Sequence, residues 1–203
     1  MSLLKHRIDS LELNFQTLTL PPPFSHSYRI SVTLKDDEPK IRFEIQYTER
    51  EQLSEEEILE EGFTPEDDYQ WEGTLPKTWR FALLSQLRNS KKLYDTPRPH
   101  AQQALSLNIS YENGEHTHGI PNNAETWEYF AQEMIQAIYE ISRKEMPLEI
   151  SYLEVSSREK IQLSIRPSFS KRNVRVISDV SGQKKQPDHD WAMLKPLLEA
   201  IYL

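Results

Sequence analysis

Hydrophobic and polar residues alternate along several short segments of this chain, as in strands that bury one face of a sheet. Leu11, Leu13 and Phe15 begin the pattern, and the three prolines at 21–23 interrupt it because proline donates no backbone hydrogen bond. Only a short charged turn separates two later segments, so we expect these two to form an antiparallel hairpin. The segments with this pattern are 11–15, 28–34, 41–47, 105–111, 148–152, 161–165 and 174–176.

Apolar residues that recur every three or four positions predict helices. The longest such stripe follows Asn123, which is a suitable N-cap, and it predicts a helix over 124–143 that packs at the centre of the protein. Residues 51–61 have helix-forming composition with few apolar residues, which predicts a short surface helix. The residues of the long stripe are Trp127, Phe130, Met134 and Ile138.

Two further helices are predicted, and each opens with a tryptophan. One spans 79–87 and has Thr78 as its N-cap. The other spans 188–202, with Asp188 as its N-cap. All elements together predict an α+β fold, in which a mainly antiparallel sheet built from β-meanders has helices packed on one face. A duplicated βββα unit would explain why both tryptophan-led helices follow three strands.

The domain organisation follows from length and from the position of the prolines. A chain of 203 residues fits one compact α+β domain over 1–203. The segment 90–103 contains two prolines and is the best candidate linker, so a division into 1–90 and 104–203 is the alternative.

Composition restricts the compartment and the available chemistry. The chain has no cysteine, which excludes thiol catalysis, cysteine-ligated zinc and disulfides, and fits a reducing compartment. No apolar run exceeds four residues, whereas a membrane-spanning helix needs about 20. We therefore expect a cytoplasmic protein without a membrane partner.

Charge is unevenly distributed along the chain. The net charge is −8, but residues 49–72 hold eleven acidic residues and one arginine, a local balance of −10. Residues 158–185 hold eight basic and two acidic residues, a local balance of +6. Such segments bind partners of opposite charge, or they are solvated surface, or they neutralise each other within the molecule.

These charged segments supply the candidate binding residues. On strands, the basic residues would form a positive face, although no helix-turn-helix, zinc-finger or RNP-type motif accompanies them, and nucleic acid is therefore not the expected partner. The acidic candidates are Glu55, Glu56, Glu57, Asp67 and Asp68. The basic candidates are Arg158, Lys160, Arg166, Lys171, Arg172 and Arg175.

His116 and His118 are the candidate metal-binding or catalytic pair. Residues two apart on a strand face the same side, so both imidazoles could reach one metal ion. A catalytic zinc site needs a third protein ligand, and the sequence places none nearby, so we expect neither a metal nor a cofactor. Asp188 and Asp190 flank His189, but helix capping explains this triplet more simply than an acid–base relay.

No recognised catalytic or phosphate-binding motif is present: GxGxxG, GxxxxGK[ST], GxSxG and HExxH are all absent. The sequence therefore favours a non-catalytic interaction protein that binds another protein through charged surfaces. The alternative is a hydrolase-like enzyme with a site near His116 and His118.

Overall fold

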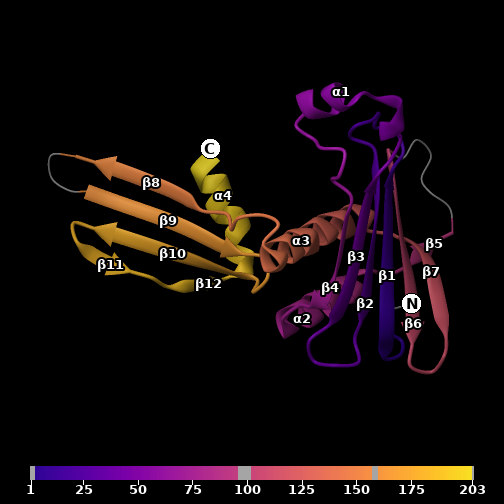
Figure 1. The fold of residues 1–203 in the computed structure, drawn as a ribbon. Helices are drawn as coiled ribbons and strands as arrows, with labels where there is room; N and C mark the ends of the chain where they lie inside the picture. Colours follow the sequence, from indigo (N-terminus) through magenta and orange to yellow (C-terminus); the bar gives the residue numbers. More distant parts are fainter. Residues whose placement is uncertain (1–2, 96–101, 157–159, 203) are drawn as a thin grey trace. The chain divides into compact units, whose positions relative to one another are not determined.

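The structure is a computed structural model of the chain that describes residues 3–95, 102–156 and 160–202. It contains two compact units, which comprise residues 1–132 and 133–203. The boundary lies within the longest helix, and the proline-containing segment 90–103 does not coincide with it. Figure 1 shows the elements of both units.

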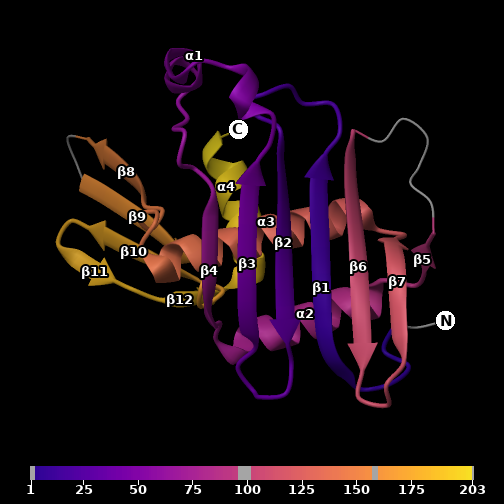
Figure 2. The ribbon, with the colours of Figure 1, turned by 45° about the vertical axis from the view of Figure 1, so that its right-hand side comes forward.

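The first unit contains a seven-stranded sheet in the order β4-β3-β2-β1-β6-β7-β5 (Figure 2), and all of its strand pairs are antiparallel. The β2–β3 pair is the hairpin expected from the sequence. The strands are β1 (Ile8–Thr17), β2 (His26–Thr33), β3 (Lys40–Tyr47), β4 (Tyr69–Thr74), β5 (Leu93–Tyr94), β6 (Gln103–Tyr111) and β7 (His116–Pro121).

Helices cover one face of this sheet. Figures 1 and 2 show α2 (Lys77–Asn89) and α3 (Ala124–Ser142) on the same side of the strands. The apolar residues of the strands face the helices, and the four residues predicted for the long helix are all buried. The ring of Phe130 packs edge-on against Trp79 and Trp127. The fold is thus α+β with a large antiparallel sheet, as the alternating pattern predicted.

Three polar groups form a chain of hydrogen bonds where α2 ends and α3 begins. The indole Nε1 of Trp127 donates a hydrogen bond of 2.8 Å to Ser90 Oγ, and Ser90 Oγ donates to Asn123 Oδ1 at 2.9 Å. Trp127 and Ser90 are fully buried. The buried polar atoms are therefore satisfied, which avoids the roughly 1–3 kcal/mol that an unpaired buried group costs.

The second unit contains a five-stranded antiparallel sheet with the path β11-β10-β9-β8, and β12 pairs with β10. A small core forms around Ile165, Val174 and Leu194, where α4 (Leu194–Tyr202) packs on the sheet. The strands are β8 (Ile150–Val155), β9 (Lys160–Ser168), β10 (Asn173–Val180), β11 (Gln183–Lys185) and β12 (Asp188–Asp190). Each unit has a meander followed by a helix, and duplication of a βββα unit stays a prediction.

Two predicted helix starts are wrong. The helix predicted to begin after Thr78 begins at Lys77 instead, and Pro76 occupies its N-cap position without a side-chain cap. Asp188 is not the cap, because its carboxylate pairs with the guanidinium of Arg175 on β10 at 2.8 Å. Asp190 is the cap: its carboxylate accepts a hydrogen bond from the backbone N–H of Ala192.

Candidate functional site

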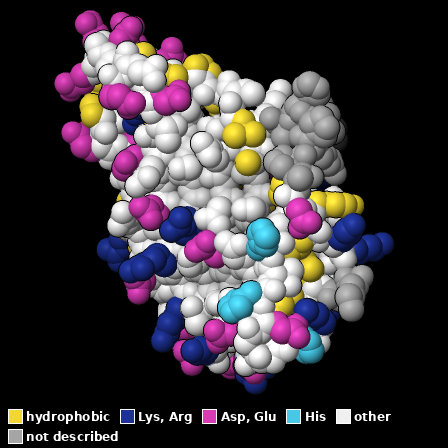
Figure 3. Space-filling model, turned by 90° about the vertical axis from the view of Figure 1, so that its right-hand side faces the viewer, with side chains coloured by type: hydrophobic (Ala, Val, Ile, Leu, Met, Phe, Trp, Pro, Cys, Tyr) yellow, Lys and Arg dark blue, Asp and Glu magenta, His cyan; other side chains and the backbone are white. Residues whose placement is uncertain are grey.

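The acidic segment lies between β3 and β4 and folds into two short helices. These are η1 (Arg50–Gln52) and α1 (Glu55–Glu60), and Ile58 of α1 is buried. Figure 3 shows Asp and Glu side chains crowded over this end of the first unit, which we name the acidic lobe and define as residues 49–68. The lobe therefore displays carboxylates on a folded support.

Arg50 holds the acidic lobe against the sheet. Its guanidinium lies 3.9 Å from the ring centroid of Tyr47 and 4.9 Å from that of Phe63. Its Nη1 pairs with Asp67 at 3.1 Å, and its other nitrogens donate to the carbonyl oxygen of Pro23. Arg50 is itself buried, so its charge is neutralised inside the lobe and leaves the outer surface acidic.

Three of the five predicted acidic residues support the lobe's own structure. Glu57 closes a capping box with Ser54, and the hydrogen bonds from Ser54 lower the pKa of Glu57. Asp68 accepts the backbone N–H of Tyr47 at 2.8 Å. Burial raises the pKa of Asp67, but hydrogen bonds from Thr64 and the pairing with Arg50 outweigh it and lower that pKa overall.

Glu55 and Glu56 differ from these three residues. Both are exposed in the first turn of α1, and within the described residues neither forms a hydrogen bond or ion pair that holds the fold. Acidic residues in the first turn are favourable there because the helix N-terminus carries partial positive charge. They are the predicted acidic residues that the fold displays to solvent without using them as supports.

The opposite face of the seven-stranded sheet is polar (Figure 3) and, within the described residues, carries no helix (Figure 1). Its charges balance: Arg42 pairs with Glu72 at 3.2 Å, and Arg29 lies 3.8 Å from Glu12. We name it the polar face. It consists of the outward residues Ser10, Glu12, Asn14, Gln16, Ser27, Arg29, Ser31, Lys40, Arg42, Glu44, Gln46, Gln70, Glu72, Ser106, Asn108, Ser110, His116 and His118.

A hollow of about 420 Å³ opens on the polar face near the lobe, and uncharged side chains such as Gln16 and Gln46 line it together with one pair of opposite charges, Arg29 and Glu44. Beside it, the carboxylate of Glu12 accepts hydrogen bonds from Asn14 at 2.9 Å and Asn108 at 3.0 Å. The hydrogen bond from Asn14 lowers the pKa of Glu12 most, and that from Asn108 lowers it further. The face thus offers many hydrogen-bonding groups and little net charge.

His116 and His118 both lie on β7 and face the solvent on the polar face, opposite Ser110 and Asn108 of β6. His116 Nδ1 lies 3.0 Å from Ser110 Oγ. Within the described residues, no three histidine, aspartate or glutamate side chains gather in a way that could hold a metal ion. A further histidine of the chain, His100, lies outside the described residues.

A serine–imidazole pair can activate a nucleophile, but only with further groups around it. Among the hydrogen bonds of the described residues, none joins a carboxylate to His116, and the pair is on an open surface. The arrangement gives the hydrolase alternative little geometric support.

The predicted basic residues belong to the second unit, and its own acidic residues neutralise three of the six. Arg166 pairs with Glu149 at 2.8 Å, Arg175 with Asp188 at 2.8 Å and Arg172 with Glu133 at 2.7 Å. These three arginines therefore do not form an unpaired phosphate-binding face.

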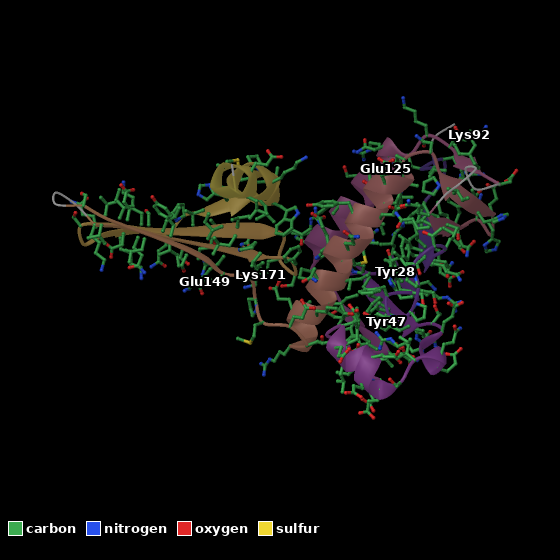
Figure 4. The ribbon with its side chains drawn as sticks, turned by 90° about the horizontal axis from the view of Figure 1, so that it is seen from above. Tyr28, Tyr47, Lys92, Glu125, Glu149 and Lys171 are labelled. Carbon is green, nitrogen blue, oxygen red and sulfur yellow. The ribbon has the colours of Figure 1, made fainter. Side chains whose placement is uncertain are left out.

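The other three predicted basic residues are two lysines and one arginine, and no ion pair described above includes them. Lys160 and Lys171 are exposed, and Arg158 lies outside the described residues. Figure 4 labels Glu149 and Lys171 at the same end of the five-stranded sheet. Basic charge in this unit is thus left mainly on separate lysines.

Comparison of the chain with protein-family models, with curated proteins and with solved structures found no match. Within the described residues, no helix has both the length and the apolar character needed to cross a bilayer.

Sequence reasoning missed the strand β4 and the buried state of Arg50. Tyr69 and Trp71 alternate with polar residues and could have indicated the strand, but the surrounding acidic charge obscured this pattern. The only basic residue in 49–72 was itself a signal, because a lone arginine amid eleven acids is a natural internal counter-charge.

Proposed function

We propose that the protein is a non-catalytic binding protein whose acidic lobe docks a basic surface of another protein. The observation that carries the proposal is the contrast within the lobe. Arg50, Glu57 and Asp67 build and fix the segment, whereas Glu55 and Glu56 are displayed outward from it.

The density of negative charge supports a binding role. Like charges close together repel one another and oppose folding, so a balance of −10 over 49–72 costs stability. A binding role would explain why this cost is retained. An anchored acidic surface steers a basic partner toward it, which raises association rates by about 10–10³-fold at low salt. The adjacent polar face adds hydrogen-bonding groups without adding opposing net charge.

Protein fits this surface better than nucleic acid. The lobe would repel phosphates, and the polar face pairs its arginines with its own glutamates. A basic protein surface would meet the lobe with opposite charge.

The test is affinity capture from the source cell with the full chain as bait. The variant Glu55→Gln/Glu56→Gln removes two charges and leaves Glu57, which caps the helix, unchanged. The control Glu38→Gln/Glu145→Gln removes the same charge at two exposed positions outside the lobe.

We expect wild type and control to retain a basic protein that the lobe variant binds about tenfold more weakly. Salt should also release this partner, because the Debye length falls from about 10 Å at 0.1 M to about 3 Å at 1 M. Equal retention by the lobe variant and the control would contradict the proposal, as would the absence of any basic protein among the captured ones.

A further inference from the structure

The strand β8 leaves one edge of the second unit's sheet open. It ends the path β11-β10-β9-β8, and within the described residues no strand pairs with its outer side. Its six residues pair with β9 in unbroken register, without a proline or a bulge. An unprotected edge of this kind is a template for another strand.

The other end of the same path shows what protection looks like. The strand β11 has only three residues, and two of them are the exposed lysines Lys184 and Lys185. Short length and lysine charge both discourage edge pairing. The two ends of the path therefore differ in their capacity to accept a partner.

Apolar side chains are exposed along β8 on both faces of the sheet. The exposed fractions are 52% for Tyr152, 59% for Leu153 and 69% for Val155. Residues alternate between the faces, so Tyr152 lies on one face and the other two lie on the opposite one. The core beneath α4 includes Ile150 alone among the residues of β8, which leaves these three side chains outside it.

We infer that β8 pairs antiparallel with β8 of a second copy of this chain, with Leu153 on the two-fold axis. A two-fold axis perpendicular to the sheet places residues of the same face opposite each other, so only every second register is allowed. The allowed registers can then be compared by the side chains they oppose.

The register centred on Leu153 sets Leu153 against itself and Val155 against Ser151. It also sets Tyr152 against Glu154 of the other copy. In the single chain the phenol of Tyr152 already donates a hydrogen bond to Glu154 at 3.0 Å. In the dimer, each phenol could donate to Glu154 of the other copy instead. The register thus brings two apolar Leu153 side chains together and matches Tyr152 with Glu154 as hydrogen-bonding partners, and such cross-strand pairs stabilise a sheet.

The neighbouring registers are worse. Centring on Tyr152 opposes Glu154 to Ile150 and Glu149 to Val155. Centring on Glu154 sets this carboxylate against its own copy, and like charges directly opposite are destabilising. The sequence of β8 therefore favours one self-pairing over the alternatives, which gives a specific dimer rather than open-ended stacking.

The absence of cysteine permits a direct test of this register. The variant Leu153→Cys would place two thiols opposite each other across the axis, while Val155→Cys would place each thiol opposite Ser151. Both full-length variants are oxidised with dissolved copper phenanthroline, and the covalent dimer is followed over time. Light scattering of the wild type, up to about 1 mM chain, measures reversible association independently.

We expect wild type to rise from one chain mass toward two with concentration, and Leu153→Cys to cross-link at least about tenfold faster than Val155→Cys. Leu153→Lys should be monomeric, and mixing it with Leu153→Glu should restore the dimer because the two charges would meet on the axis. Equal cross-linking of the two cysteine variants, or a single chain mass at every concentration, would overturn the inference. Circular dichroism identifies any variant that fails to fold, and the wild-type mass measurement stands without it.

Discussion

The indole Nε1 of Trp191 donates a 2.7 Å hydrogen bond to Oε1 of Glu133. The other carboxylate oxygen of Glu133 pairs with Arg172 at 2.7 Å, and Arg172 also lies 5.4 Å from the indole ring. The Glu133 side chain is only 8% exposed. One carboxylate on α3 therefore joins Arg172, in the turn between β9 and β10, to Trp191, which directly follows β12.

Glu133→Ala should lower the free energy of unfolding of the full chain by about 3–5 kcal/mol, because it removes a largely buried carboxylate that pairs with Arg172 and accepts from Trp191. Glu133→Gln should cost less, since an amide oxygen still accepts from Trp191. Urea-induced unfolding measures both. Equal losses below about 1 kcal/mol for the two variants would contradict this account.

Phe130→Ala should destabilise the first unit by about 3–5 kcal/mol, a large share of the 5–15 typical of a domain. The reason is that Phe130 is 6% exposed and contacts two tryptophans. The control Phe81→Ala removes a ring that is 62% exposed and should cost about 0.5 kcal/mol or less. Chemical denaturation distinguishes them, and an unchanged midpoint for Phe130→Ala would be incompatible with the packing described.

Arg50→Lys should loosen the acidic lobe without unfolding the sheet. Lysine keeps the charge but lacks the planar fork that reaches Asp67 and Pro23 while stacking on Tyr47. A glutamate-specific protease should then cut within 51–68 about tenfold faster than in wild type. Arg42→Lys, at an exposed ion pair, is the control, and identical cleavage of both variants would refute the role assigned to Arg50.

Glu12 should contribute to stability at neutral pH and lose that contribution in acid. Its pKa in the folded protein is lowered by hydrogen bonds, so its stabilisation is present above the ordinary value of 4.5 and disappears as pH falls through the folded value. Glu12→Gln should therefore melt below wild type at about pH 7, and the difference should narrow at about pH 3. Glu38→Gln, at an exposed turn, is the control, and a constant difference for Glu12→Gln would disprove the linkage.

The regular elements could be predicted from the sequence wherever burial is one-sided. Tyr28, Ile30 and Val32 are buried and alternate with polar residues, so the strand and its facing were predicted together. The start of the last helix was not, because Asp188 and Asp190 are both suitable caps and both pair with β10. Only their side-chain partners decide: the carboxylate of Asp188 pairs with Arg175, and that of Asp190 accepts from Ala192. Long-range pairing of this kind has no local sequence signal.

The candidate site was predictable as a region but not residue by residue. Charge counting identified the acidic segment, yet it could not separate Glu57 and Asp67, which hold the lobe together, from Glu55 and Glu56, which face outward. Likewise the basic residues looked available, whereas Glu133, Glu149 and Asp188 neutralise three of them. Ion pairs between distant residues are invisible to a local charge sum.

The enclosed hydrogen bond between Trp127 and Ser90 means that substitutions at these two sequence positions are coupled. An indole N–H in a dry interior requires an acceptor, so a chain that lost the hydroxyl at 90 would keep this interior only by also replacing the indole at 127. The same requirement allows α3 one rotation about its own axis, since a turn of roughly 100° to the next residue would carry the indole away from its acceptor. The polar contact thus selects one rotation of α3 among several that apolar side chains alone would tolerate.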